Sequence, residues 1–471
     1  MSEKNANSGN NDDSDEKVPL KLNIGYAIGE ITDMVAYQGF SFLIFTFYSV
    51  VMGVNTSTIT VVFIIWSIFN AFNDPILGAL SDRTKTKHLG GGRRLPWIVS
   101  MLIPLSLIMV LLFTPPGDND ITRAVYMCFI MILFDTIYTA YSINHTSLYP
   151  EMFRTNAERE QAGRGRRIAM VLGLILAVGL PGLFITQYTG DREVAIAEYR
   201  MAGIAMGVVI FITMLIHIKF GIKEPPVEEI KEKEILSFKE SLKVTLKNKN
   251  FLILVGASSM NWYVFTLIPL ILPIYVAGAL GEPNADSTTL LLLIAFLSSA
   301  IGVVIWSKVD AKVGSKTGLI IAMFYWALTS IPYLFVTEYN IALICMVFTG
   351  IGLGGPPYFI DRNVSNVADA DELKTKCRRE ASYYGINAVF IRLAIILVIL
   401  SINTVFQYNG WEEPDVATIT EGQKFGLRLL MSVFPAVAML IGILCLKFFP
   451  YGKKEVQELQ SKMKEFCAAQ D

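Results

Sequence analysis

Twelve stretches of about 20 mainly apolar residues follow one another along this chain and constrain its fold more than any other feature. Lipid offers no hydrogen-bond partners, so a segment that crosses a bilayer must satisfy its own backbone groups, as an α-helix does. The predicted spans are residues 22–52, 57–81, 95–115, 121–153, 166–188, 197–221, 251–279, 287–308, 317–337, 340–361, 381–406 and 424–448. The fold class is therefore an all-α integral membrane protein.

The composition agrees with a bilayer environment. Charged residues make up 17% of the 471 residues, whereas soluble domains average about a quarter. The net charge of −1 gives no reason to expect nucleic-acid binding. The five cysteines lack metal or redox spacing, so we expect no cofactor and no metal beyond a coupling ion. Residues 1–21 lack the basic start and apolar core of a signal peptide, and we expect a disordered cytosolic N-terminus.

Lysine and arginine are distributed unevenly among the loops. Loops 82–94, 154–167 and 362–380 hold five each, 219–250 holds eight and 308–316 holds three, whereas the alternate loops hold few. Cytosolic loops carry such an excess. Twelve spans bring both termini to the same side, so we predict a plasma-membrane protein with both termini in the cytosol.

The long basic loop divides the chain into two halves. The predicted organisation is a six-helix bundle at 22–221, a cytosolic loop at 222–250, a second six-helix bundle at 251–448 and a cytosolic tail at 449–471. Basic segments recur at matching places in both halves. Alternating-access carriers are built from such repeats, with the substrate near mid-depth between them. We expect a monomer.

Asp74 lies near the middle of the second predicted span. A carboxylate at that depth costs at least about 2.5 kcal/mol, so a proton, a cation or a basic partner must neutralise it. Asn70 and Asn73 share its side of the helix, and Thr139 lies level with it on the fourth span. Such oxygens suit a hard cation, so we predict a site for Na⁺ or, through protonation of Asp74, for H⁺. The alternative is that these side chains only cap a helix bent before Pro75.

Other polar side chains lie deep in the spans. Asp33 and Arg392 are about 15 to 17 Å from the cytosolic helix ends at a rise of about 1.5 Å per residue, and we expect both to face the substrate. The alternative for Arg392 is an ion pair with Asp33 or Asp135. A polar stripe on the fourth span contains Asp135, Tyr138, Thr139, Ser142 and Thr146. We expect Asp135 nearer the outer leaflet and Glu30 toward a cytosolic vestibule.

A basic hairpin follows the second span. We expect its charged residues to form ion pairs with one another and with an acid at the end of the fourth span. These pairs would hold the cytosolic helix ends together and break when that side opens. These residues are Asp82, Arg83, Arg93, Arg94 and Glu151. The alternative is that the charges only fix the orientation in the membrane.

Several of these motifs resemble the glycoside–pentoside–hexuronide:cation symporter family, the melibiose permease type of the major facilitator superfamily. The matching segments in the first half are 25–33, 70–78, the Gly-Arg-Arg-Leu-Pro-Trp hairpin at 92–97, 147–152 and 158–167, and those in the second half are 366–369 and 379–392. The resemblance covers roughly residues 22–450. It implies a twelve-helix major facilitator fold and cation symport.

The resemblance also assigns residues. The two acids of the family's cation site correspond to Asn70 and Asp74, so one carboxylate is missing, which weakens the case for Na⁺ and strengthens that for H⁺. The family's sugar-binding residues on spans four, five and eleven correspond to Ser142, Thr146, Arg167 and Arg392. An anionic substrate such as a uronate suits these arginines better than a neutral sugar.

The predicted function is secondary active transport, by cation-coupled symport of a sugar or glycoside through alternating access. The alternative substrate is a lysolipid or another amphipathic molecule. A membrane prenyl transferase also uses an Asn-x-x-x-Asp run, but it needs further acids that this sequence lacks. No phosphate-binding loop of a pump and no channel filter is recognisable either, and enzyme activity is not expected.

Overall fold

Twelve apolar helices form the core of the protein. The computed structural model describes residues 18–84, 92–117, 119–153, 155–186, 191–224, 245–375 and 380–468. Within these ranges eleven helices are long and apolar enough to cross a membrane, and one further apolar helix, Leu95–Leu111, is shorter. They match the twelve predicted spans in chain order, so the predicted all-α membrane fold is confirmed.

The N-terminal half contains six of these helices, two of which end in a π-helical turn. They are α1 (Leu20–Thr46) with η1 (Phe47–Val51), α2 (Thr56–Asp82), α3 (Leu95–Leu111), α4 (Asp120–Met152), α5 (Asn156–Gly182), and α6 (Arg192–Ile216) with η2 (His217–Gly221). Within this half α1 packs along α5 and α6, and α4 packs between α2 and α3. The long helix α1 is therefore the central element of the half.

The C-terminal half contains the other six spans, several of them built from two helices or turns. They are α8 (Lys249–Ile274) with η4 (Tyr275–Ala279), α9 (Ala285–Val313), α10 (Ser315–Ser330) with η5 (Ile331–Leu334), α11 (Tyr339–Leu353) with α12 (Gly355–Thr375), α13 (Glu380–Tyr408), and α14 (Glu421–Met431) with α15 (Val433–Lys447). A short turn η6 (Val416–Thr418) precedes α14. The tail forms α16 (Lys453–Ala468), which packs on α12 and α10.

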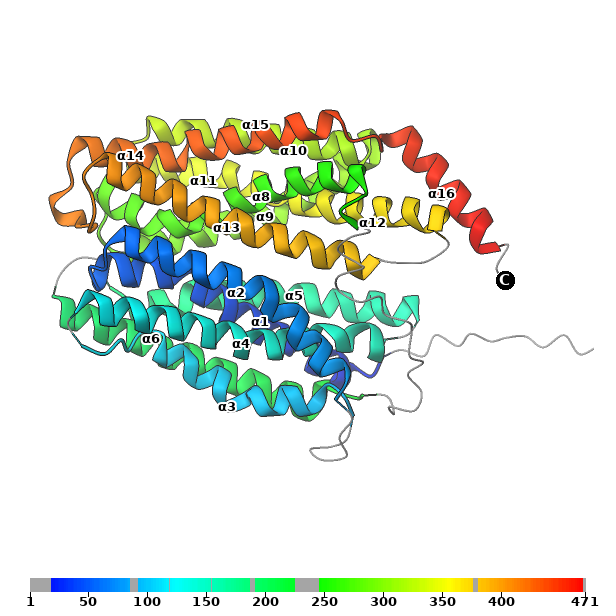
Figure 1. Cartoon of the computed structure of the whole chain (residues 1–471), viewed down its shortest axis with the longest axis horizontal. Coiled ribbons are helices and arrows are strands. Elements are labelled where there is room, and N and C mark those ends of the chain that lie inside the picture. The colour runs from blue at the N-terminus through cyan, green and yellow to red at the C-terminus, as the bar shows by residue number, and fades with distance from the viewer. Residues whose placement is uncertain are drawn as a thin grey trace, which may run out of the picture.

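The two halves lie side by side with their helices roughly parallel (Figure 1). Between them α2 packs on α13, α5 on α9, and α1 on α8. Most of the predicted cytosolic loop at 222–250 lies outside the described residues. Helices α2 and α13, which carry Asp74 and Arg392, thus meet at the seam between the halves.

Large apolar side chains cover much of the outer surface. Phe72, Ile76 and Leu80 on α2 are each more than half exposed, and so are residues such as Phe129 and Phe324 on other helices. Contiguous exposed apolar surface of this kind is rare on a soluble protein. It suits contact with lipid chains, as the sequence predicted.

Helix α5 begins about ten residues earlier than predicted. The sequence placed the start at residue 166 because arginines precede it, but the helix starts at Asn156. A capping box forms there, in which the Thr155 hydroxyl accepts from the Glu158 amide and the Glu158 carboxylate accepts from the Thr155 amide. The arginines therefore lie on the first turns of a helix, which fixes the direction in which each one points.

Pro75 interrupts the hydrogen bonding of α2 next to Asp74. Proline has no backbone N–H, so the carbonyl group of Ala71, four residues earlier, loses its helical donor. The helix nevertheless continues to Asp82. Asp74, Pro75 and Ala71 also line a cavity at the seam.

Candidate cation and substrate site

Asp74 forms an ion pair with Arg392 across the seam between the halves. A guanidinium nitrogen of Arg392 lies 3.3 Å from Asp74 Oδ2, and Thr139 donates a 3.0 Å hydrogen bond to Asp74 Oδ1. The other terminal guanidinium nitrogen donates to the Tyr37 hydroxyl at 3.3 Å. The predicted neighbours Asp74 and Thr139 are thus brought together, and the partner of Arg392 is Asp74, not Asp33 or Asp135.

A second carboxylate lies beside this pair. Asp135 of α4 is buried, and its two carboxylate oxygens accept hydrogen bonds from the side-chain amides of Asn70 and Asn73. The Oδ1 atom of Asn70 is buried and has no hydrogen-bond partner among the described residues. The asparagines therefore face Asp135, while Asp74 one turn away faces Thr139 and Arg392.

Asp135 supplies the carboxylate that position 70 lacks. The sequence comparison with the symporter family left only one acid near Asn70, and we expected Asp135 closer to the outer leaflet. The structure puts Asp135 in contact with Asn70 and Asn73, and its depth in the membrane stays a prediction. Its place in the polar stripe of α4, one turn before Thr139, was the signal that pointed to this role.

Carboxylate, amide and hydroxyl oxygens therefore gather here from two helices of one half. They are the oxygen atoms of Asp74, Asp135, Asn70 and Thr139, a set that hard cations favour. The asparagine amides present hydrogens to Asp135 in this arrangement, and a rotation of either amide would present its oxygen instead. The residues thus fit a small cation that would take the place of the asparagine N–H groups and of the Arg392 guanidinium as the partner of the two carboxylates.

Three of the predicted substrate residues, Asp33, Tyr138 and Ser142, lie together in the N-terminal half. Tyr37 stacks on Tyr138, with 5.1 Å between the ring centroids. Asp33 is buried near Tyr138 and Ser142, and its Oδ1 atom has no hydrogen-bond partner among the described residues. A polar path thus runs from Asp33 past the two tyrosines to Arg392.

Two other predicted substrate residues, Arg167 and Thr146, have exposed side chains, and their role stays a prediction. It is Arg166 that points inward, with its Nε atom 2.5 Å from Glu30 Oε2. Neighbouring residues on a helix point about 100° apart, so resemblance at the level of sequence does not decide between the two arginines.

The cavity at the seam adjoins the ion pair. Its volume is about 280 Å³. Side chains of α2 and α13 line it, namely Ala71, Asp74, Pro75, Gly385, Ala388, Val389 and Arg392. Most of this wall is apolar, so a molecule here would meet one acid, one guanidinium and a hydrocarbon surface.

The described part of the basic hairpin forms a dense network where α2 ends and α3 begins. Arg94 is 2.6 Å from Asp82 and 3.0 Å from Glu151, and Arg93 is 2.7 Å from the same glutamate. Backbone amides at the start of α3 bind the carboxylate of Glu224.

The partners that the structure gives these residues all belong to the N-terminal half, and Arg83 is exposed. In this conformation the pairs therefore brace the helices of one half to one another. These partners do not test the expectation that the ion pairs break when the cytosolic side opens.

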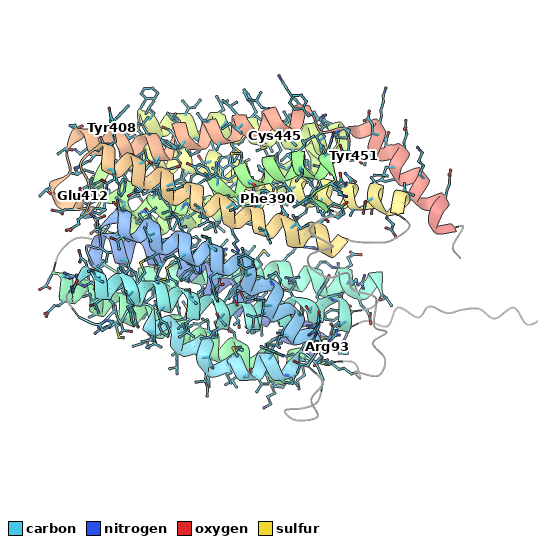
Figure 2. All side chains as sticks on the ribbon, viewed as in Figure 1. Arg93, Phe390, Tyr408, Glu412, Cys445 and Tyr451 are labelled. Carbon is cyan, nitrogen blue, oxygen red and sulfur yellow. The ribbon has the colours of Figure 1, made fainter. Side chains whose placement is uncertain are left out.

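The two halves are instead joined at the opposite end. Ser57 donates to Asn403 at 3.2 Å and accepts from Gln407 at 3.1 Å. The Thr56 amide donates to the carbonyl of Glu412, and the Ala285 amide donates to that of Thr186. Figure 2 shows Glu412 at this end and Arg93 at the other. The described contacts thus close one end of the seam.

Comparison with known proteins identifies the family. The sequence profile described as MFS/sugar transport protein matches residues 25–453. The chain belongs to this family. It is therefore a multi-pass membrane transporter of the major facilitator superfamily, not an enzyme such as a prenyl transferase, and the predicted resemblance is confirmed.

Some relatives of this chain are named for different substrates. An uncharacterised symporter of Synechocystis is 21% identical, covering 96% of this chain and 97% of its own. The sodium-dependent lysophosphatidylcholine symporter 1-A of Danio rerio is 22% identical over 92% of this chain and 87% of its own. The isoprimeverose transporter of Lactiplantibacillus pentosus is 24% identical over 52% and 50%. The family thus implies a small-molecule substrate and a coupling cation.

A solved structure supports the same fold. The crystal structure of the nucleoside transporter NupG aligns with a TM-score of 0.65 and 13% identity, covering 91% of this chain and 99% of that one. At this identity the likeness concerns the fold alone. The arrangement of two six-helix halves is thus shared with a known transporter.

Proposed function

We propose that this protein is a cation-coupled symporter of an anionic sugar or glycoside, such as a uronate, and that it works by alternating access. The observation that carries the proposal is the Asp74–Arg392 pair, which joins the two halves beside the buried Asp135. An acid and a guanidinium at the seam give a cation and an anion one binding group each.

The pair also explains how the two solutes are coupled. A cation that binds between Asp74 and Asp135 displaces the guanidinium of Arg392. A charge left without a partner in the interior costs several kcal/mol. The freed Arg392 then favours an anionic substrate, so each solute promotes binding of the other. Coupling free energies of this kind are about 1–3 kcal/mol, or roughly 5- to 150-fold in affinity.

The orientation follows from the basic loops. We place both termini in the cytosol of a plasma membrane and expect the protein to act as a monomer. On that orientation, the end closed by Ser57 and Glu412 is the outer one. The conformation would then be the one from which substrate leaves toward the cytosol.

A second substrate class is a lysophospholipid. The observation that favours it is the cavity of about 280 Å³, whose wall combines Arg392 with apolar side chains of α2 and α13. A phosphate can pair with the guanidinium as well as a carboxylate can. The lysophosphatidylcholine symporter of Danio rerio, which aligns along nearly the whole chain, supports this candidate.

The test is uptake into proteoliposomes under imposed Na⁺ or pH gradients. The probes are labelled methyl glucuronide, methyl galactoside and lysophosphatidylcholine. We expect gradient-driven accumulation of the glucuronide in the parent protein. Movement of the lysolipid alone would favour the second class, and movement of none of the three under either gradient would contradict the proposal.

The variant that tests the site is Asp74→Asn. We expect it to lose gradient-driven accumulation while exchange of substrate across the membrane partly survives, because the cation loses its main ligand. Asp120→Asn, at an exposed acid at the start of α4, is the matched control and should behave as the parent does. Unchanged accumulation in Asp74→Asn would remove Asp74 from the coupling mechanism.

A further inference from the structure

Four ionisable side chains meet inside the N-terminal half, away from the seam. His145 Nδ1 of α4 lies 3.2 Å from His217 Nε2 of η2, and His145 Nε2 lies 3.4 Å from Glu30 Oε2 of α1. His217 Nδ1 lies 3.1 Å from the carbonyl oxygen of Gly25. Arg166 of α5 donates to the same Glu30 oxygen at 2.5 Å. The result is a hydrogen-bonded chain from Arg166 through Glu30 and both imidazoles to the backbone.

The local fold is built around this chain. A side chain at Gly29 would place its Cβ atom 2.7 Å from His145 and 2.9 Å from His217, so only glycine leaves room for both rings. The π-helical turn η2 crosses α1 at Gly25, where a Cβ atom would lie 2.6 Å from the backbone of Gly221. This close approach brings His217 to His145.

Aromatic rings fill the space around the imidazoles. Tyr26 and Tyr141 stack on His145, with centroids 4.9 and 5.7 Å away. Their hydroxyls donate to backbone carbonyls and leave the ring nitrogens of His145 free to bond Glu30 and His217. The cluster is closed on these sides and reaches the surface at Arg166, whose side chain is 27% exposed.

The hydrogen bonds require one proton more than two neutral histidines supply. A carbonyl oxygen can only accept, so Nδ1 of His217 must carry a proton. The contact between the two imidazoles needs a second proton, and the contact between His145 and Glu30 needs a third. Each neutral imidazole carries only one N–H. The third proton must therefore be bound by the cluster itself.

The charges of the cluster lead to the same count. Asp33 lies one turn beyond Glu30 on α1 and is buried near the same groups. Two carboxylates then face one guanidinium, with His145, His217 and the hydroxyls of Tyr26, Tyr138 and Tyr141 as the remaining titratable neighbours. An uncompensated buried negative charge is costly. One bound proton makes the group electrically neutral.

We propose that Glu30, His145 and His217 form a proton-binding site that is separate from the cation site at Asp74. The bound proton is shared within the histidine pair, because the guanidinium of Arg166 already pairs with Glu30. Arg166 gives the site its contact with the surface. Asp33 offers the next acceptor toward Ser142, Tyr138 and the seam.

The role of this proton in transport rests on the proposed function. A proton that enters at Arg166 and leaves through Asp33 would drive the carrier alongside, or in place of, a metal cation at Asp74. Occupancy of the site does not rest on that function, because it follows from the geometry of the cluster. The two statements can therefore be tested apart.

Occupancy is tested by counting protonated ring nitrogens with ¹⁵N-histidine NMR of the full-length protein in nanodiscs. The chain has three histidines, so a His88→Gln background leaves the two of the cluster. At pH 7 we expect three protonated ring nitrogens in this parent. In Glu30→Gln we expect two, because the new amide can donate to His145 Nε2. Glu421→Gln, at an exposed acid, is the control and should retain three.

An infrared spectrum decides where the proton lies if the parent shows two protonated nitrogens. A carboxylic-acid band that disappears in Glu30→Gln would place the proton on Glu30 and still support the site. Two protonated nitrogens without such a band would overturn the proposal. The spectra of the parent already give the nitrogen count, so this part does not depend on the folding of the variant.

Uptake of labelled methyl glucuronide tests the role in transport. We expect a pH gradient to drive uptake at least about tenfold in the parent, and Glu30→Gln to lose this component but keep the one driven by Na⁺. Equal pH-driven uptake in both would show that the site binds a proton without coupling it. If no probe moves under any gradient, the proposed function fails while the proton count still stands.

Discussion

The Arg166–Glu30 and Arg392–Asp74 ion pairs differ in where their partners lie. Arg166 and Glu30 belong to one half, and their closest atoms are 2.5 Å apart. Arg392 and Asp74 belong to different halves and are 3.3 Å apart. If the halves move relative to each other, only the second pair must break in each cycle. A short, well-buried ion pair at the seam would oppose the motion of the halves. In the longer pair that is observed there, Asp74 and Arg392 can each exchange the other for a solute.

This comparison separates two uses of an ion pair within the helices. The pair within one half moves with its helices and organises a fixed cluster around the histidines. The pair across the seam is placed where solutes can compete for each partner. Changes at the first should therefore affect stability and proton binding, and changes at the second should affect coupling.

The largest effect is expected for Arg392→Ala. Loss of a charged hydrogen-bonding group costs about 1.5–3 kcal/mol, so uptake of an anionic substrate should fall roughly 10- to 100-fold. Cation binding should strengthen, because Asp74 loses its competitor. Proteoliposome uptake and Na⁺ titration of thermal stability measure the two effects.

Arg166→Ala provides the contrast for that experiment. It should lower thermal stability, because Glu30 remains buried without its guanidinium. If Arg392→Ala lowered stability as much and left cation binding unchanged, the pair at the seam would be structural, and the distinction between the two pairs would fail.

A gain of cation affinity is expected for Asn70→Asp. The change adds a second carboxylate next to Asp135 and removes an amide that now satisfies it. Because a bound cation relieves the repulsion between the acids, half-saturation by Na⁺ should occur at roughly tenfold lower concentration, about 1.4 kcal/mol. Asn284→Asp, at an exposed position before α9, adds the same charge as a control. Equal Na⁺ dependence in both variants would argue against a cation site.

A moderate loss of stability is expected for Gly29→Ala. The added methyl group overlaps both imidazoles, and overpacking of this kind costs about 1–3 kcal/mol. Thermal unfolding in detergent should therefore begin several degrees lower. Gly78→Ala is the matched control, since a Cβ atom there meets nothing within 4 Å. An unchanged unfolding temperature in Gly29→Ala would mean that the histidine cluster is looser than described.

The smallest effect is expected for Ser57→Ala at the closed end. The change removes two hydrogen bonds across the seam, each worth about 0.5–1.5 kcal/mol at most in this exposed setting. Distances between spin labels on the ends of α2 and α13 should show a severalfold larger open population. Ser100→Ala, whose hydroxyl bonds within α3, should show none. If Ser57→Ala left the open population unchanged, side-chain packing alone would hold this end of the seam closed.

The spans were predictable because length and apolar content suffice to define a membrane helix. All twelve appear in order. The site was predictable in part. Asp74 and Thr139 do meet, but the pair of Asp74 and Arg392 links residues 318 positions apart, which no local pattern encodes. The contacts of Asp135 with Asn70 and Asn73 depend on which faces of α2 and α4 meet, and packing sets those faces.

Which side chains point into a site depends on the rotation of each helix about its own axis. A choice between Arg166 and Arg167 needs the phase of α5, which the capping box at Thr155 fixes. The contact between His145 and His217 depends on the glycines that let α1 and η2 approach. Each of these residues was visible in the sequence, but the small residues that bring them together carried no signal of their own.

Pro75 has a consequence for any attempt to disable the site. The imino acid leaves the Ala71 carbonyl without its helical donor, at the wall of the cavity and one turn from the seam pair. This oxygen belongs to the main chain, so side-chain replacement at Asp74 or Asp135 leaves it in place. A variant that lacks both the Asp74 and the Asp135 carboxylate should therefore still bind small cations weakly. Only replacement of Pro75 by a residue with a backbone N–H would abolish this binding.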